Sequence, residues 1–174
     1  MIITRHDLEL FTDTHPDEEN NQFDLFCGAS EDIVKSYLRY NPELQEYDLY
    51  LNGSGTNELH VPAKPITEIR KITIDDAEQS PDDFAFEDDV LFSIKNQTFT
   101  KGSRNIHLQF KAGFETVPAI IKETCLRIAG LLSTEVGNIG ITSKSFQDSG
   151  TRTFTNTTNF DRYLFQISNY RLLG

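Results

Sequence analysis

The chain has 174 residues, of which 37% are hydrophobic, and a formal net charge of −11 at pH 7. This length suits one compact domain, or a helical core with a modest inserted subdomain, and no apolar run approaches the ~20 residues that a membrane span needs. The acidity argues against a surface that binds nucleic acid by neutralising phosphates. It fits a surface that DNA passes without sticking, or simply good solubility.

The acidic charge is concentrated at the start of the chain. Residues 1–50 carry three basic and twelve acidic side chains, residues 51–116 seven and eleven, and residues 117–174 six and four. The opening MIITRHDLELF has no apolar signal core and no small-residue cleavage site, so we expect a protein made and kept in the cytosol.

Two helices are predicted before residue 44. A capping box of Thr4 and Asp7 opens the first, which runs through Phe11. After a break at residues 15–16, the second should run to about Tyr40, where Asn41 and Pro42 stop it. The apolar face expected for the pair consists of Ile2, Ile3, Leu8, Phe11, Phe23, Phe26, Cys27, Ile33, Val34, Tyr37 and Leu38.

From Tyr47 the apolar period changes from that of a helix to that of a strand. Residues 47–51 read as a strand, 52–55 as a turn, and 58–61 as the returning arm of a β-hairpin. Further β segments are predicted over 66–74, 84–94 and 106–110, with an acidic loop over 75–83. This pattern predicts an antiparallel β module inserted in a helical frame.

The segment 117–136 predicts the central helix. Pro118 suits its first turn and Gly137 its C-terminal cap, and the apolar arc covers about half of the helical wheel. Leu126 and Gly130 interrupt the polar side with a small apolar notch, so they are our candidates for a subunit contact. The chain then divides into N-terminal helices (1–44), the β module (45–113), the central helix (114–139), and an extended arm with a C-terminal helix (140–174), forming one structural domain overall.

The last segment indicates a binding partner. Residues 141–155 alternate like a hairpin but are poor in apolar side chains. Thr158 and Asp161 should cap a final helix whose apolar stripe is Phe160, Tyr163, Leu164, Ile167, Tyr170 and Arg171. A poorly packed arm followed by an apolar helix needs a surface to cover it, in its own domain or in a neighbour.

No catalytic motif stands out, so no cofactor and no metal is predicted. Cys27 and Cys125 each lie in an apolar helical pattern and read as free buried thiols. The four histidines are scattered, and the Gly53–Thr56 run reads as a turn rather than a phosphate cradle. Acidic pairs in the β module read as solvated loop charge, although a hydrolase whose site is dispersed along the chain stays open as an alternative.

The order of several short motifs resembles the head–tail connector (adaptor) proteins of long-tailed bacteriophages. The motifs are VPAIIK at residues 117–122, GITSKSFQD at 140–148 and NYR at 169–171. The segments ASEDI at 29–33, ITEI at 66–69 and AGF at 112–114 are also similar to that family.

The resemblance implies a fold and a role. The fold is α+β: a small α-helical bundle core with an inserted antiparallel β module and a C-terminal arm plus helix. The role is structural, not enzymatic: a ring of about twelve copies in the virion neck under the portal, after assembly in the host cytoplasm. The ring would extend the DNA channel, let packaged DNA pass without specific binding, and dock the tail, a stopper or tail-completion protein, or the next neck ring.

If the roles of the corresponding segments in that family are carried over by position, the resemblance implies that the arm and the last helix bind the portal. The candidate residues are Ser143, Phe146, Arg152, Phe154, Phe160, Tyr163, Leu164, Ile167, Tyr170 and Arg171. No cofactor and no membrane is implied. The alternative within the same class is another phage structural module, such as a tail-completion or capsid-decoration component.

Overall fold

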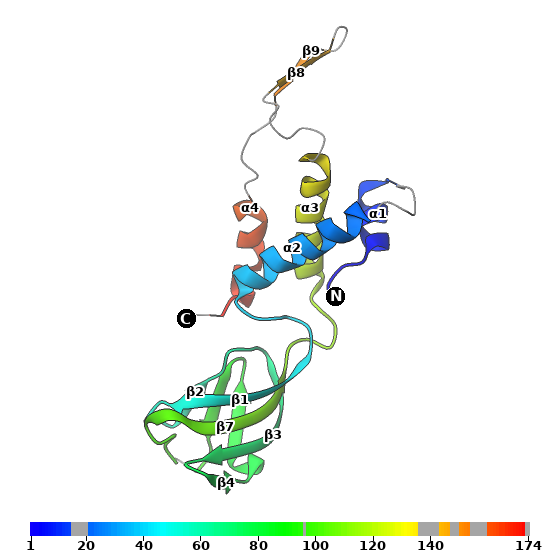
Figure 1. The fold of residues 1–174 in the computed structure, drawn as a ribbon. Helices are drawn as coiled ribbons and strands as arrows, with labels where there is room; N and C mark the ends of the chain where they lie inside the picture. Colours follow the sequence, from blue (N-terminus) through cyan, green and yellow to red (C-terminus); the bar gives the residue numbers. More distant parts are fainter. Residues whose placement is uncertain (15–20, 96, 136–142, 147–149, 154–159, 173–174) are drawn as a thin grey trace. The chain divides into compact units, whose positions relative to one another are not determined.

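Helices occupy the two ends of the chain and strands its middle, which confirms the predicted α+β class (Figure 1). The computed structural model describes residues 1–14, 21–95, 97–135, 143–146, 150–153 and 160–172. Contacts divide the chain into two units: a helical unit of residues 1–37 with 118–169, and a β unit of residues 38–117 with 170–174. Among the described residues, no helix is long and apolar enough to cross a membrane.

The helical unit is built around α3 (Ala119–Glu135), which lies between α1 (Arg5–Thr12) and α4 (Asp161–Leu164) (Figure 1). The helix α2 (Gln22–Leu38) completes the unit. The predicted capping box is confirmed: the Asp7 N–H donates to the Thr4 hydroxyl, and the Thr4 N–H donates to the Asp7 carboxylate. The buried side of α3 consists of Ile121, Thr124, Cys125, Ile128 and Ala129.

A buried carboxylate fixes the N-terminal segment. Glu31, which is 7% exposed, accepts hydrogen bonds from the N–H groups of Ile2 (2.6 Å) and Ile3 (3.0 Å). Lys35, one turn later on α2, donates to the other carboxylate oxygen at 3.0 Å. Hydrogen bonds to an ionised group are stronger than neutral ones, so Glu31 holds Ile3 in the core, where it is fully buried.

The β unit contains two antiparallel sheets. The first has the strand order β1-β7-β3-β4 and the second β2-β6-β5. The strands are β1 (Gln45–Gly53), β2 (Glu58–His60), β3 (Ile66–Ile74), β4 (Ala77–Gln79), β5 (Phe84–Glu87), β6 (Val90–Ser93) and β7 (Gly102–Ala112), and η1 (Pro81–Asp83) is a 3-10 turn. The core that both sheets share consists of Leu59, Val61, Ala63, Ile66, Ile72, Ile74, Phe84, Leu91, Phe99, Ile106, Leu108, Phe110 and Ala112.

The predicted hairpin between the first two strands is wrong. The strand β1 pairs with β7, whereas β2 pairs with β6 in the other sheet. The segment around Phe99 separates them: the Gly55 N–H donates to the Phe99 carbonyl and the Phe99 N–H to the Thr56 carbonyl, both at 2.7 Å. Because Phe99 is fully buried, the turn that was expected to close a hairpin is instead part of the packing between the sheets.

The acidic segment 75–83, predicted as a loop, contains the strand β4 and the 3-10 turn η1. Asp75 and Asp76 adopt φ angles of 50° and 63°, so they form the turn that brings Ala77–Gln79 back against β3. Aspartate tolerates the left-handed region better than most residues do, because its short polar side chain bonds the local backbone.

The predicted C-terminal helix is confirmed, but only its first turn is α-helical. The chain forms one turn of α-helix, α4, and continues as the 3-10 helix η3 (Phe165–Tyr170). Ile167 is β-branched, and Ser168 and Asn169 compete for backbone hydrogen bonds, so all three weaken an α-helix. The predicted hairpin in the arm is confirmed as β8 (Ser143–Phe146) and β9 (Gly150–Thr153), whereas the predicted cap Thr158 lies outside the described residues.

Within the β unit, Gly113 lies where three segments meet. Its N–H donates to the Pro65 carbonyl at 2.9 Å, and the next residue, Phe114, donates to the Pro42 carbonyl at 2.8 Å. The Phe114 ring packs edge-on against Tyr170, 5.9 Å between centroids. Gly113 has φ of 111°, and a Cβ there would lie 2.4 Å from the Glu43 carbonyl oxygen.

We therefore expect Gly113→Ala to destabilise the protein by about 2–4 kcal/mol, because it adds both a backbone strain and a clash with main chain. Urea unfolding measures the change. The matched control is Gly28→Ala on α2, where a Cβ meets nothing within 4 Å; it should stabilise by up to ~1 kcal/mol. Equal stability of the two variants would contradict this account.

Replacing Glu31 tests the anchoring of the N-terminal segment. Glu31→Gln keeps the size but loses the charge and one acceptor oxygen, so we expect a loss of about 1–3 kcal/mol in unfolding free energy. Asp32→Asn, on the exposed side of the same helix turn, should change stability by less than about 0.5 kcal/mol. Hydrogen exchange of the Ile2 and Ile3 amides should speed up in the first variant only.

Candidate interaction surfaces

The helix α1 is held against α3 by an ion pair and by apolar packing. Lys122 donates to the Asp7 carboxylate at 2.9 Å. Farther along α3, the open side of Gly130 faces α1: a Cβ there would lie 3.6 Å from the Phe11 ring and 3.7 Å from the Thr12 methyl group. The two residues that the sequence marked for a subunit contact, Leu126 and Gly130, are both only partly exposed.

Large apolar side chains are exposed on this side of the helical unit. The exposed fractions are 65% for Leu10, 46% for Phe11 and 70% for Leu25. Leu10 and Leu25 lie off the apolar faces predicted for their helices, which is why the sequence analysis did not select them. Bulky apolar residues on an otherwise polar helix face are the signal that could have identified them.

The C-terminal stripe, predicted to bind a portal, points largely into its own unit. Tyr163, Leu164 and Ile167 are 8%, 9% and 0% exposed. Two guanidinium groups flank the Tyr163 ring, those of Arg127 and Arg162, at 5.8 and 4.4 Å from its centroid, and Arg162 also donates to the Tyr163 hydroxyl. This packing holds α4 against α3.

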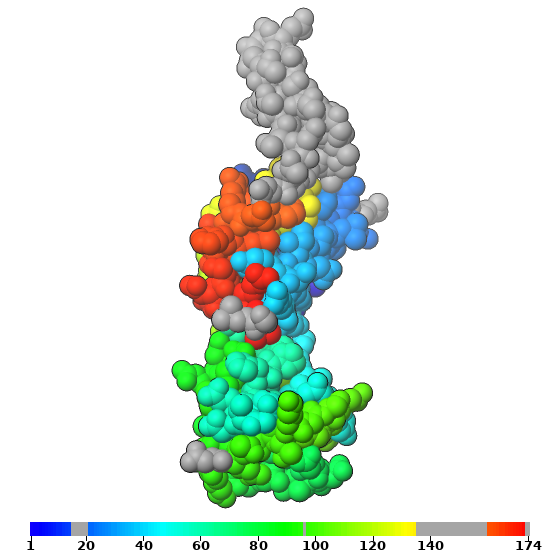
Figure 2. All heavy atoms as spheres, turned by 90° about the vertical axis from the view of Figure 1, so that its left-hand side faces the viewer, coloured from blue at the N-terminus to red at the C-terminus, as the bar shows by residue number. Residues whose placement is uncertain are grey.

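The remaining members of that stripe divide between the two units. Phe160 is the half-buried N-cap of α4, while Tyr170 and Arg171 are half-buried, with Tyr170 against Phe114. The large apolar side chain that η3 exposes is that of Phe165, at 75%. In Figure 2 the residues of α4 and η3, orange to red, form part of the surface that faces the viewer.

The arm forms a sheet of its own. Among the described strands, β8 and β9 pair with each other and with no other strand, in a register that places Ser143 opposite Thr153 and Lys144 opposite Arg152. Ser143 and Phe146 are therefore in β8 and Arg152 in β9, whereas Phe154 lies outside the described residues. An isolated two-stranded hairpin is marginally stable in water, so the arm gains stability when a partner covers it.

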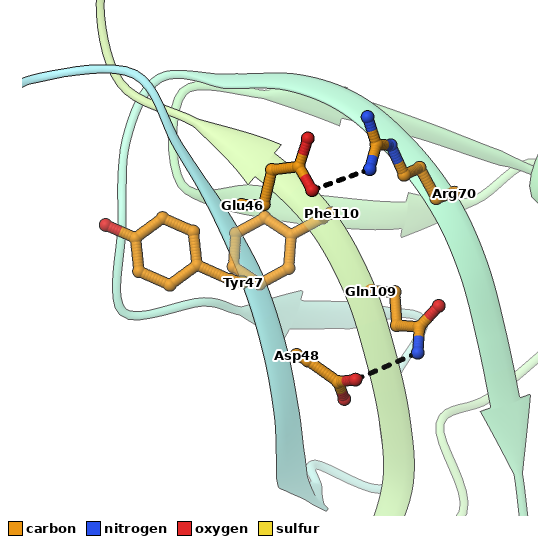
Figure 3. Close-up of a pocket in the computed structure, with 6 residues that line it drawn as sticks. All are labelled: Glu46, Tyr47, Asp48, Arg70, Gln109 and Phe110. Atoms are coloured by element: carbon orange, nitrogen blue, oxygen red, sulfur yellow. Dashed lines mark hydrogen bonds and ion pairs between the residues drawn. The ribbon is translucent and has the colours of Figure 1, made fainter.

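The outer face of the first sheet is polar and pairs its own charges. Figure 3 shows a shallow hollow between two bridges, Glu46 with Arg70 at 2.8 Å and Asp48 with Gln109 at 2.9 Å. Asp48 also accepts from His107 at 2.6 Å, a hydrogen bond that lowers the pKa of this carboxyl. Acidic and basic side chains here neutralise one another, which leaves little charge to attract a ligand.

The structure also shows where the cysteines and His60 lie. Cys27 and Cys125 are free and buried, as predicted, and burial raises the pKa of the two thiols to about 11 and about 12. His60 is paired with Asp89 at 3.3 Å. Among the described residues, no group of three or more His, Cys, Asp or Glu side chains is placed to hold a metal ion.

Comparison with known proteins gives one family. A family model described as "Head completion protein" matches residues 1–167. No curated protein sequence matches the chain significantly. Among solved structures, the chain is similar to one in a structure described as "Neck of empty GTA particle computed with C6 symmetry", with a TM-score of 0.64, 7% sequence identity, and coverage of 99% of this chain and 91% of that chain. At this identity the similarity concerns the fold alone.

The Asp7 carboxylate, which joins α1 to α3, gives a test by pH. Burial raises its pKa, but hydrogen bonds from Lys122 and Thr4 outweigh that effect and bring the pKa below its ordinary value of 3.8. A carboxyl whose pKa is lowered by folding stabilises the protein above the unfolded pKa, and this contribution is lost as the pH falls through the folded one.

We therefore expect Asp7→Asn to lower the unfolding free energy at pH 7 by about 0.5–1 kcal/mol. The deficit relative to the parent protein should shrink as the pH falls below about 4. Urea titrations at a series of pH values measure it. The control is Asp13→Asn, at the exposed end of the same helix, which should leave the pH dependence of the unfolding free energy below about pH 4 unchanged. A loss of unfolding free energy in Asp7→Asn that stays the same at every pH would contradict the assignment.

Proposed function

This chain belongs to the head completion protein family, and from that premise we propose that it is a head–tail connector, or adaptor, of a phage-like particle. In this role a ring of about twelve copies sits under the portal in the neck, extends the DNA channel, and docks the tail, a stopper or tail-completion protein, or the next neck ring. The role is structural rather than enzymatic.

The family match confirms the broader part of the sequence resemblance, a structural protein that completes the head of a phage-like particle. The adaptor position is our proposal. The observation that carries it is the arm: its two described strands pair with each other and with no other strand in the part of the chain that the structure describes, and they lie within the matched residues 1–167. The similarity in fold to a chain from a neck structure supports the same placement.

We assign the portal contact to the arm, with Ser143, Phe146, Arg152 and Phe154 as its candidates. The register pairs Lys144 with Arg152, so two basic residues lie directly opposite each other in the hairpin. Like charges at paired positions favour a partner that supplies negative charge. An acidic groove or strand edge on the portal is therefore the expected counterpart.

The other portal-binding candidates support the arm in this proposal. Tyr163, Leu164 and Ile167 are buried in the helical unit, so they hold the returning end of the arm in place. Phe160 lies where the arm re-enters α4, and the half-buried Tyr170 and Arg171 continue into the β unit. Their contribution to portal binding is indirect, through the position of the arm.

The charge of the protein suits a channel wall. With a net charge of −11 and a pI of about 4.7, the ring repels the phosphate backbone within a Debye length. Packaged DNA would then pass without specific binding. Leu126, partly exposed on α3, and Gly130, beside α1, remain our candidates for the edge of a contact between subunits.

The alternative is another structural module of the same particle, a tail-completion or capsid-decoration component. It would use the β unit, whose exposed Phe86 and Ile94 (39% and 62%) offer a small apolar surface. Labelled chains seen at a single capsid vertex would favour the connector, and labels spread over the capsid would favour decoration.

Removal of the arm tests the proposal directly. We replace residues 143–153 by a Gly-Ser-Gly linker and expect the unfolding free energy to change by less than about 0.5 kcal/mol, since the described residues of β8 and β9 join neither of the sheets of the β unit. Joining of heads to tails in an in vitro complementation assay should fall at least tenfold. Ile94→Ser is the matched control and should complement fully. Normal joining without the arm would contradict the proposal.

A further inference from the structure

We propose that neighbouring copies of this chain meet through two opposite flanks of the helical unit. The first, the α1 flank, consists of Leu10, Phe11 and Leu25. The second, the Phe165 flank, consists of Phe165 and the adjacent Arg162. In the assembled ring the Phe165 flank of one copy packs on the α1 flank of the next. This inference rests on the ring proposed above and names the surfaces that close it.

Exposure is the first reason. Phe165 is 75% exposed, Leu25 70%, Leu10 65% and Phe11 46%. Single exposed apolar residues are normal in proteins, but Leu10 and Phe11 are adjacent, and the first turns of α2, with Leu25, lie on the same side of the unit as α1 (Figure 1). The Asp7 carboxylate of α1 also acts electrostatically on the Cys27 thiol, two residues after Leu25.

The arrangement of the helices is the second reason. Because α3 lies between α1 and α4, the two flanks are on opposite sides of one unit (Figure 1). A ring needs a heterologous contact, in which one patch meets a different patch on the next copy. Two unlike patches on opposite sides meet this requirement, whereas a single self-complementary patch gives a two-fold dimer.

Charge and rigidity are the third reason. The α1 flank has the acidic residues Asp13 and Asp24 beside its apolar side chains, and the Phe165 flank has the exposed Arg162 together with the exposed Asp161, one turn before Phe165. Opposite charges at the rim set the orientation of two surfaces that meet. Both flanks are also preorganised: the Lys122–Asp7 ion pair holds α1, and the fully buried Ile167 holds η3. Preorganised surfaces lose less entropy on binding.

These observations favour a second copy over the portal as the occupant. A portal contact needs only one surface, and it would leave the opposite flank exposed in the assembled neck. Both flanks instead expose bulky apolar side chains that can cover each other, and Arg162 of one flank can pair with Asp13 or Asp24 of the other. The portal is then left to the arm, and the two contacts of the chain do not compete.

Cysteine cross-linking in assembled particles tests the pairing. We introduce Leu10→Cys and Phe165→Cys, singly and together, and treat purified necks with a short bis-maleimide. The native thiols of Cys27 and Cys125 are buried, so they should not react in the folded protein. The double variant should give a ladder of dimers, trimers and larger species, and each single variant should give monomers only. The control Leu10→Cys/Ile94→Cys, with Ile94 exposed on the β unit, should also give monomers.

The outcomes separate this inference from the proposed function. Dimers from a single variant would indicate a two-fold contact and overturn the pairing. Monomers from the double variant, in necks that contain the protein, would overturn the pairing and leave the connector role intact. If the protein were absent from the necks, the proposed function would fail and the inference with it.

Substitution with a charged residue gives an independent measurement. Phe165→Asp and Leu25→Asp each place a carboxylate in the centre of one flank, and we expect the amount of protein in purified necks to fall at least tenfold. Ile94→Asp should be incorporated normally. Because all three positions are exposed, thermal unfolding of the free variants should match that of the parent protein. Normal incorporation of Phe165→Asp would overturn the inference.

Discussion

The buried carboxylate of Glu31 determines how the helical unit is assembled. The N-terminal residues belong to no helix or sheet, so the N–H groups of Ile2 and Ile3 need an acceptor inside the protein. Glu31 supplies it from α2. Ile3, fixed in the core, is followed directly by Thr4, the N-cap of α1. The helix α1 therefore begins at a position from which Asp7 forms an ion pair with Lys122 of α3.

Both units pair charges on their surfaces, and they differ in how far they expose large apolar side chains. In the β unit, Glu46, Arg70 and Lys111 join a network of ion pairs on the outer face of the first sheet. A surface whose charges already pair gains little from a charged partner, because each pair must first be broken and desolvated. The helical unit also pairs charges, such as Lys122 with Asp7, but its Phe165 (75%) is more exposed than Phe86 (39%) or Ile94 (62%) of the β unit. Burial of such an apolar side chain gains free energy without that cost.

Local signals in the sequence predicted the elements better than their pairing. The capping box of Thr4 and Asp7 and the alternation over 106–110 specify their structures within a few residues, and both are confirmed. The partner of β1 was missed because it depends on Phe99, which is far along the chain and inserts between the two sheets. The stripe around Tyr163 was identified as apolar, but periodicity alone does not say whether such a stripe covers its own core or a neighbour's.

The position of the arm connects the two proposed contacts. The arm belongs to the segment that connects Glu135, the last residue of α3, to Asp161, the first residue of α4. The same pair of helices therefore carries the base of the arm and, next to it, the exposed Phe165. A neighbour seated on Phe165 would therefore lie next to the base of the arm, so the proposed contact between copies and the proposed portal contact would involve adjacent parts of the chain.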